Sequence, residues 1–219
     1  MAKTKITQTK LIGEIDKCLP QTQCTKCGFP SCISYAQAIA ASKASINQCP
    51  PGGEITIRNL ATLLDLSPTP LNADYGPIPA PQHAFIDETN CIGCTLCIQA
   101  CPVDAILGAA KQMHTVITDE CTGCELCIIP CPVDCIIMAP SDPPLENEFS
   151  QWPGLSARRV MQARKRFGNR FNRISRIDRA SHSRRDKNAM RDEIMASVDR
   201  VQRGRLKQYL SPKNTSNTQ

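Results

Sequence analysis

Two helical patterns occupy the first part of the chain. Leu11, Ile15 and Cys18 recur at i, i+4 and i+7, and a proline ends this pattern two residues later. The run ISYAQAIAASKASI predicts a second helix over residues 33–46. Residues 1–66 are therefore expected to form a mostly helical unit.

The middle of the chain changes to short β-type patterns. The run SPTPLNADYGPIPAPQ, residues 67–82, is rich in proline and predicts an extended, semi-rigid spacer. The runs AFID, HTVIT and IIM, at residues 84–87, 114–118 and 136–138, are typical of short strands. A small strand-containing module is expected over residues 83–140, which makes the fold α+β.

The end of the chain, residues 141–219, predicts a linker followed by a helical tail. Two stripes of apolar residues recur at helical spacing: Val160, Ala163, Phe167, Phe171, Ile174 and Ile177, and then Met190, Ile194, Val198 and Val201. Residues 155–219 carry 18 Lys and Arg against 5 Asp and Glu, whereas residues 1–154 carry 8 against 15. The tail is basic and the body acidic.

Several roles suit such a tail. It could pack on its own acidic body, dock on an acidic partner protein, lie on an anionic membrane surface or touch nucleic acid. Phe167 and Phe171 lie within the apolar stripe, so we expect them to be buried rather than free to stack on bases. This expectation disfavours nucleic acid.

The composition points to metal chemistry. The chain of 219 residues has 14 Cys and only 4% aromatic residues, which is little material for one large core. No secretory h-region and no apolar run of membrane-spanning length is visible, so we expect a cytoplasmic chain whose cysteines bind metal rather than form disulfides.

A repeat carries most of these cysteines. CIGCTLCIQACPVDAI begins at Cys91 and CTGCELCIIPCPVDCI begins at Cys121, and both copies have the spacing C-x2-C-x2-C-x3-C-P. This spacing is typical of bacterial modules with two [4Fe–4S] clusters, in which the fourth cysteine serves the other cluster. The predicted ligand sets are Cys91, Cys94, Cys97 and Cys131 for one cluster, and Cys121, Cys124, Cys127 and Cys101 for the other. Zinc sites rarely use three cysteines so spaced.

Four further cysteines lie upstream. Cys24, Cys27, Cys32 and Cys49 have the spacing C-x2-C-x4-C-x16-C. Four thiolates satisfy one iron–sulfur cluster, but the spacing alone also permits a structural zinc ion.

The segments QTQCTKCGFPSC and INQCPPGG, followed by the repeat, resemble the B subunit of Rnf-type electron transport complexes over roughly residues 8–140. The resemblance implies a third [4Fe–4S] cluster, held by the upstream four cysteines. It also implies a helical four-cysteine domain, a proline-rich linker and a bacterial-type 2[4Fe–4S] ferredoxin-like module. Unlike typical members, this sequence shows no N-terminal membrane helix and adds the basic tail.

The remaining candidates are expected to be structural. Cys18 and Cys135 are interpreted as packing residues, the latter because the first copy has Ala105 in its place. The aspartates of the two CPVD segments are expected to cap turns. The three histidines, His83, His114 and His182, are expected to be ordinary strand or surface residues.

The expected function is electron relay through three [4Fe–4S] clusters, with no substrate chemistry by this chain alone. Expected partners are redox proteins such as a flavoprotein, a ferredoxin or membrane-complex subunits, with the chain cytoplasmic or peripheral on the inner membrane. The alternatives are a redox-sensing or nucleic-acid-associated iron–sulfur protein, and an electron-donating subunit of a cytosolic oxidoreductase.

Overall fold

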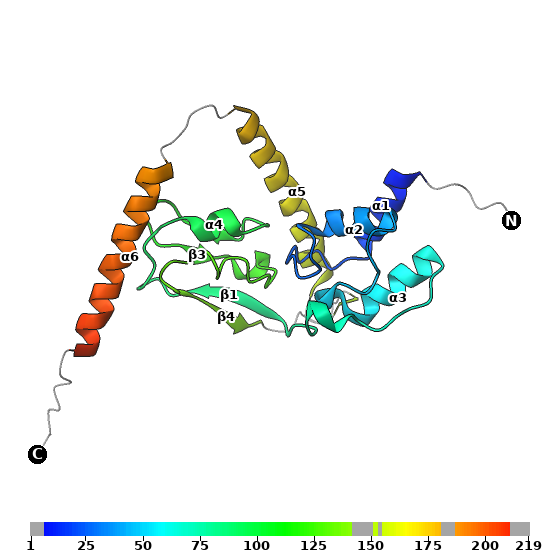
Figure 1. The fold of residues 1–219 in the computed structure, drawn as a ribbon, viewed down its shortest axis with the longest axis horizontal. Helices are drawn as coiled ribbons and strands as arrows, with labels where there is room; N and C mark the ends of the chain where they lie inside the picture. The colour runs from blue at the N-terminus through cyan, green and yellow to red at the C-terminus, as the bar shows by residue number, and fades with distance from the viewer. Residues whose placement is uncertain (1–6, 142–150, 153–154, 181–186, 211–219) are drawn as a thin grey trace, which may run out of the picture.

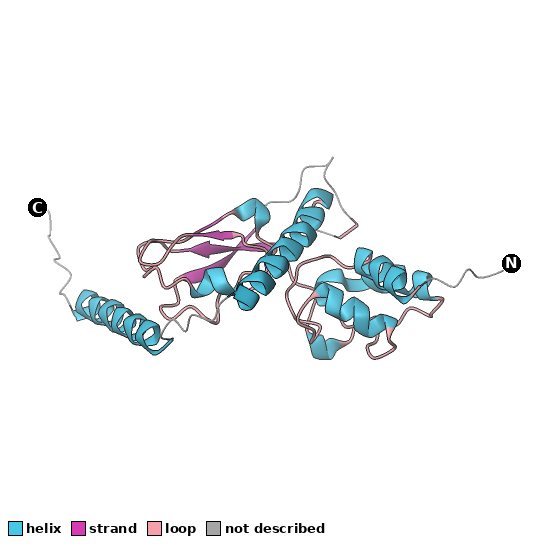
Figure 2. Cartoon of the chain, turned by 90° about the horizontal axis from the view of Figure 1, so that it is seen from above, coloured by secondary structure: helices cyan, strands magenta, loops and turns pink. Residues whose placement is uncertain are grey.

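The structure is a computed structural model that describes residues 7–141, 151–152, 155–180 and 187–210 (Figure 1). The helices of residues 8–64 gather at one end, two small antiparallel sheets lie in the other half, and helix α6 lies at the opposite end. A long helix, α5, crosses between these halves, as a second view shows (Figure 2). The fold is therefore a mixture of helices and small sheets, as the α+β prediction requires.

The first half is a three-helix unit. It contains α1 (Gln8–Lys17), α2 (Cys32–Ala40) and α3 (Gly53–Leu64). Ile15, Tyr35 and Leu60 are almost fully buried where these helices meet. The Tyr35 hydroxyl donates to the carbonyl oxygen of Ser45 at 2.6 Å, so this buried phenol has a partner.

The predicted second helix is shorter than expected. It ends at Ala40 instead of residue 46. Ser42 has φ +55°, and the amide of Lys43 donates to the carbonyl oxygen of Ala38 at 2.8 Å, which closes the helix with a left-handed turn. The periodicity did not reveal this end, because the alanines of this run continue to favour a helix.

Two antiparallel sheets build the second half. The first pairs β1 (Gln82–Ile86) with β4 (Ile136–Pro140), and the second pairs β2 (Ile106–Leu107) with β3 (Thr115–Val116). Pairing β1 with β4 joins the start and end of the repeat-containing segment. Strands were predicted at β1, β3 and β4, whereas β2 was missed.

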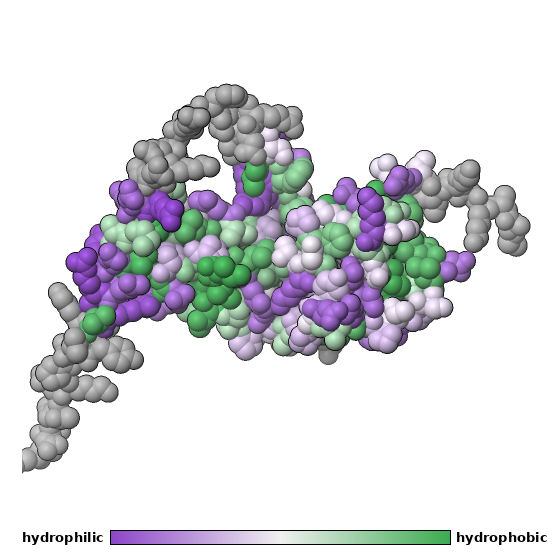
Figure 3. All heavy atoms as spheres, in the orientation of Figure 1, coloured by the Kyte–Doolittle hydropathy of each residue, from purple (hydrophilic) through white to green (hydrophobic). Residues whose placement is uncertain are grey.

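The two faces of the first sheet differ. Ala84 and Ile86 point into the core, whereas Phe85 and its cross-strand partner Ile137 are 52% and 59% exposed. Figure 3 shows a hydrophobic area over β1 and β4.

The proline-rich spacer is anchored to the helical unit. It has no helix except a short 3-10 turn, η2 (Ala73–Tyr75). The side-chain amide of Asn47 donates to the carbonyl oxygen of Pro70 at 2.8 Å, and the amide of Asn72 donates to the carbonyl oxygen of Asn47 at 3.0 Å. The spacer is thus extended, as predicted, and part of it follows the surface of the first half.

The tail helices α5 (Ala157–Ala180) and α6 (Lys187–Leu210) pack on the second half. Ala163 of α5 and Val198 of α6 are buried in the same core as the β-strands. The outer part of each stripe departs from the prediction, because Phe171, Ile174 and Met190 are 63%, 39% and 45% exposed. The expected burial of Phe171 was wrong. Ile177 lies outside the described side chains.

Arginines of α5 are bound to the chain's own body. Arg166 donates to the backbone carbonyl oxygens of Val103 and Asp104 at 2.6 and 2.7 Å. Arg170 bonds the carboxylate of Asp104 at 2.9 Å, and Arg164 bonds that of Asp16, in the helical unit, at 2.9 Å. The helix therefore contacts both halves of the molecule.

The second tail helix makes equivalent contacts on the other copy of the repeat. Arg205 of α6 donates to the backbone carbonyl oxygen of Val133, the counterpart of Val103, at 2.8 Å. Lys111 forms an ion pair with Glu193 at 2.8 Å. No helix among the described residues combines the length and apolar character needed to span a membrane.

Candidate metal-cluster sites

One enclosed cavity combines cysteines of both copies of the repeat. Its walls include Cys121, Cys124 and Cys127 of the second copy and Cys101, the last cysteine of the first. All four are buried. The remaining walls are mostly apolar, from Ala84, Val103, Ala105, Ile106 and Met138, and include the polar residues Thr122 and Glu125. We call this the inner site, because it lies in the copy that touches the helical unit.

A second cavity has the reciprocal composition. Cys91, Cys94 and Cys97 of the first copy meet Cys131, the last cysteine of the second. Ile86, Ile92, Val133, Ile136, Cys135 and His114 complete its lining. We call this the outer site. The four cysteines of each predicted ligand set therefore lie around one cavity.

The backbone follows the same path in both copies. Gly93 and Gly123 have φ +68° and +66°, and Thr95 and Glu125 have φ +64° and +66°. These left-handed residues turn the chain tightly between cysteines. A Cβ on Gly93 would lie 2.6 Å from the amide nitrogen of Gln112, and one on Gly123 would meet the carbonyl oxygen of Gln82. Both glycines are needed because another segment of the chain passes against each loop.

Backbone amides point at the sulfur atoms. The amide of Ala105 donates to Cys101 Sγ at 3.2 Å, and that of Ala84 donates to Cys121 Sγ at 3.4 Å. Such bonds favour the charged thiolate, which is the form that binds metal.

Burial opposes the thiolate form when no metal is bound. It raises the pKa of Cys97 and Cys127 to about 12 and that of Cys124 to about 11. The irons of a cluster supply the positive charge that compensates for burying four thiolates. Four cysteines around each cavity, with backbone amides directed at two sulfurs of the inner site, therefore fit a [4Fe–4S] centre in each site.

The upstream cysteines also lie together. Cys24, Cys27 and Cys49 are buried, and Cys32 is half-buried at the start of α2. Burial is the main cause that raises the pKa of Cys49, and the neighbouring Cys32, Cys24 and Cys27 thiols raise it further. The four sulfurs are thus close enough to interact electrostatically. We call this set the upstream site.

Local structure explains how Cys49 reaches the other three. The 3-10 turn η1 (Pro50–Gly52) follows it directly and leads into α3. A Cβ on Gly52 would collide with Thr56 and lie 3.1 Å from Cys49 Sγ, so only glycine fits against this sulfur. On the opposite side, the amide of Cys32 donates to the side-chain oxygen of Gln23 at 3.0 Å.

Within the described ranges, no three or more His, Cys, Asp or Glu side chains are arranged to hold one metal ion.

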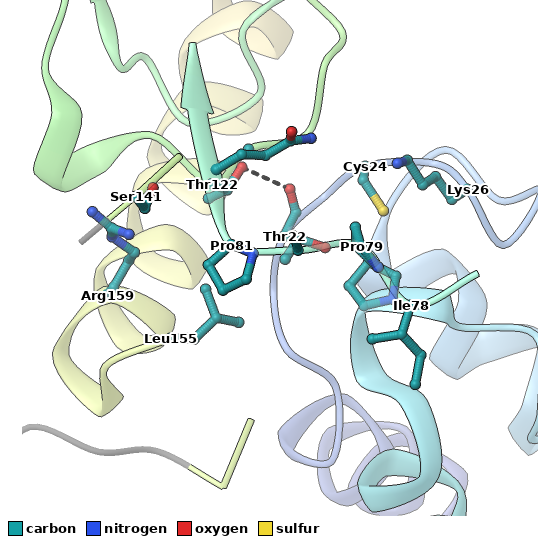
Figure 4. A pocket seen from close by; sticks show the side chains of 14 residues that line it. Thr22, Cys24, Lys26, Ile78, Pro79, Pro81, Thr122, Ser141, Leu155 and Arg159 are labelled. Carbon is teal, nitrogen blue, oxygen red and sulfur yellow. Dashed lines mark hydrogen bonds between the residues drawn. The ribbon is translucent and has the colours of Figure 1, made fainter. Parts of the chain in front are cut away.

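The upstream and inner sites meet at the contact between the two halves. The hydroxyl of Thr122 donates to the backbone carbonyl oxygen of Thr22 at 2.9 Å (Figure 4). Lys26 forms an ion pair with Glu125 at 3.1 Å beside this bond. Cys24 lines the same pocket as Thr122, whose neighbour in the chain is Cys121.

The two remaining cysteines occupy different environments. Cys18 is half-buried against the helical core, and its thiol donates to the carbonyl oxygen of Glu14 at 3.4 Å. Cys135 is buried, and its sulfur lies 3.5 Å from that of Cys131. It lines the outer site, as Ala105 of the first copy lines the inner site.

One histidine was misjudged from the sequence. His114 was expected to be an ordinary strand or surface residue, but it is 1% exposed and its Nδ1 lies 3.2 Å from Cys97 Sγ. Burial lowers its pKa. His83 does fit the expectation, bonding Ser141 at the surface end of β1, and His182 lies outside the described residues.

The CPVD aspartates lie in turns, as predicted. Asp104 and Asp134 have φ +53° and +50°, which are left-handed turn conformations. Asp104 additionally accepts bonds from Arg170 and Arg173, a role that the local sequence did not reveal.

Comparison with known families places these cysteine-rich segments in the iron–sulfur class. Residues 84–138 match the family described as a 4Fe-4S dicluster domain. Residues 19–51 match a family described as an Fe-S cluster. The second match covers all four upstream cysteines.

Three similar proteins are named as the B subunit of an ion-translocating oxidoreductase complex. The one from Thiobacillus denitrificans is 63% identical over 116 residues, which cover 53% of this chain and 62% of that protein. The one from Alkalilimnicola ehrlichii is 60% identical over 111 residues, covering 50% and 60%. The one from Pseudomonas aeruginosa is 61% identical over 106 residues, covering 48% and 55%.

The chain therefore resembles these B subunits, as the motifs indicated, and its matched part spans about three fifths of their length. No solved structure matched the chain.

Proposed function

We propose that this chain holds three [4Fe–4S] clusters and relays electrons through them. The observation that carries the proposal is the pair of enclosed cavities, each lined by three cysteines of one copy of the repeat and the last cysteine of the other. The proposed ligands are Cys24, Cys27, Cys32 and Cys49 upstream, Cys101, Cys121, Cys124 and Cys127 in the inner site, and Cys91, Cys94, Cys97 and Cys131 in the outer site.

The upstream site is proposed to hold a cluster rather than zinc. The family match over residues 19–51 favours iron and sulfide.

The proposed layout has four parts. Residues 1–66 are the helical four-cysteine unit, residues 67–82 the linker, residues 83–140 the ferredoxin-like module, and residues 141–219 the linker and basic tail. The contacts of α5 with Asp16 in one unit and Asp104 in the other support a fixed relation between the two cluster-bearing units.

The proposed path runs from the upstream site through the inner site to the outer site, or in reverse. Each bound cluster would supply a one-electron centre. The residues of the chain set the path: the Thr122–Thr22 bond holds the upstream and inner sites against each other, and the crossed cysteines hold the inner and outer sites in one core. Apolar walls exclude water and so limit the reorganisation that accompanies charge transfer.

We further propose that the chain works as a subunit of an ion-translocating oxidoreductase complex, with other subunits of that complex as its redox partners. The names of the similar proteins support this assignment. Partner docking through the tail receives less support, because several α5 arginines already bind the chain's own carbonyls and carboxylates. The same contacts disfavour nucleic acid as a partner.

Stepwise reduction tests the relay. Anaerobically prepared protein is expected to take up about three electrons per chain, one for each cluster. Cys24→Ser should reduce the uptake to about two, because it removes an upstream ligand without touching the crossed repeat. The measurement is a reductive titration followed by optical and EPR spectroscopy. Uptake of one electron or none by the intact chain would rule out the three-centre relay.

Cys18→Ser is the matched control for this titration. Cys18 lies in the same unit, but its thiol bonds a backbone carbonyl of α1 rather than facing the other upstream cysteines. The variant is expected to take up as many electrons as the unaltered chain. A decrease equal to that of Cys24→Ser would show that the loss reflects unfolding of the unit instead of a missing ligand.

A further inference from the structure

The two sites of the repeat are not chemically equivalent, and His114 is one of the differences between them. His114 begins the strand segment that precedes the second copy, seven residues before Cys121. Seven residues before Cys91, the corresponding position is Ala84. The inner site therefore receives a backbone amide from Ala84, whereas the outer site receives an imidazole from His114.

The geometry assigns the direction of the bond at the outer site. His114 Nδ1 lies 3.2 Å from Cys97 Sγ. A thiolate that binds iron carries no proton and can only accept, so Nδ1 must carry the hydrogen that it donates to sulfur. Nε2 is buried and makes no hydrogen bond among the described residues. The bond to sulfur therefore decides which ring nitrogen is protonated.

The ring is held in place by close packing. It is 1% exposed, and it lies against Gly108, where a Cβ would collide with the ring carbon Cδ2. Gly108 has φ +150°, a conformation that side-chain-bearing residues rarely adopt. Gly108 thus leaves room for the imidazole of His114, and the close packing limits the movement of the ring. A ring that directs a hydrogen-bond donor at sulfur needs such a fixed position.

We propose that His114 is a tuning residue that raises the reduction potential of the outer cluster through its bond to Cys97. This inference rests on the proposed function, since it needs a cluster in the outer site. Reduction adds one electron to the cluster and its thiolates, and a donor aimed at sulfur stabilises the more negative state. Ala84, at the equivalent position, supplies only its backbone amide to the inner site, so this side-chain bond acts on the outer cluster alone.

The test is a potentiometric titration of the reconstituted full chain, followed by EPR, after the iron and sulfide contents have been measured. In His114→Phe a ring remains but the donor is lost. We expect the midpoint potential of the outer cluster to fall. At a fixed potential the ratio of reduced to oxidised cluster should be about tenfold lower, which corresponds to a shift of about 59 mV for one electron. His114→Asn, whose amide nitrogen lies near the place of Nδ1, should restore most of the potential.

A control and a second variant keep the test decisive. His83→Ala removes a histidine that bonds Ser141 on β1 and should move no potential. If His114→Phe binds less iron, His114→Ala, which reproduces the residue at position 84, is measured in its place. Unchanged potentials in a fully loaded His114 variant would overturn the tuning role and leave the relay intact. Absence of clusters in the unaltered chain would instead contradict the proposed function.

Discussion

Cys101→Ser is expected to remove one cluster, about four of twelve irons, and Cys124→Ser in the same chain is expected to remove no further iron. Both residues line the inner site, although they belong to different copies of the repeat. Once one ligand is lost and the cluster fails to assemble, loss of a second ligand of the same cluster changes nothing more. Iron and sulfide analysis of the single and double variants measures this directly.

The matched comparison uses the first copy. Cys101→Ser combined with Cys94→Ser should remove about eight irons, because Cys94 lines the outer site. Uncrossed ligation predicts the opposite pattern, in which the Cys101 and Cys94 variants remove the same four irons and the Cys101 and Cys124 variants remove eight. Cys135→Ala controls for substitution of a buried cysteine beside a site, and it should leave the iron content unchanged.

A chain ending at Ser150 is expected to be less stable by at least ~4 kcal/mol, because it loses several buried apolar side chains. Val160, Ala163 and Val198 are each less than 9% exposed in the full chain. Trp152 is also buried, and its indole nitrogen donates to Thr56 of the helical unit at 2.9 Å. Anaerobic urea denaturation of both chains, followed by circular dichroism, measures the difference.

Single substitutions test whether the contacts of α5 with the body contribute to stability beyond the formation of the helix itself. Arg166→Ala removes bonds to two backbone carbonyls next to Cys101 and should destabilise the chain by about 1–3 kcal/mol. Arg158 lies on the exposed face of the same helix, so Arg158→Ala should cost less than ~0.5 kcal/mol. Equal stability of the full-length and shortened chains would contradict the packing of the tail on the body. A second result would also contradict this packing. If salt releases the full-length chain from membranes and only that chain behaves so, the tail is a membrane anchor.

The grouping of the cysteines around the two cavities was predictable from the sequence, because cysteines that bind one cluster recur at fixed spacing. Three cysteines two residues apart leave a cluster one ligand short, and the repeat offers one candidate for each deficit. The turns at Gly93 and Gly123 were expected to be tight, but the reason for glycine there was not visible. It lies in the passage of Gln112 and Gln82 against the loops, which are contacts between segments distant in the sequence.

The errors share a physical cause. The periodicity of a helix does not show how much of its apolar stripe the body of the chain covers. The outer part of the tail stripe, including Phe171, was therefore expected to be buried, but it is exposed. His114 was underestimated because a single histidine in a strand has many ordinary roles. Aligning the segments before each copy would have drawn attention to it, since Ala84 and His114 occupy the same place. The arginine partners of Asp104 come from α5, more than sixty residues away, and no local pattern indicates them.

The content of iron, acid-labile sulfide and zinc in the anaerobically purified full chain tests the central claim most directly. Three clusters predict about twelve iron and twelve sulfide per chain, with no stoichiometric zinc. About eight iron with one zinc would contradict the account, because the upstream cysteines would then hold a structural ion and the relay would have two centres.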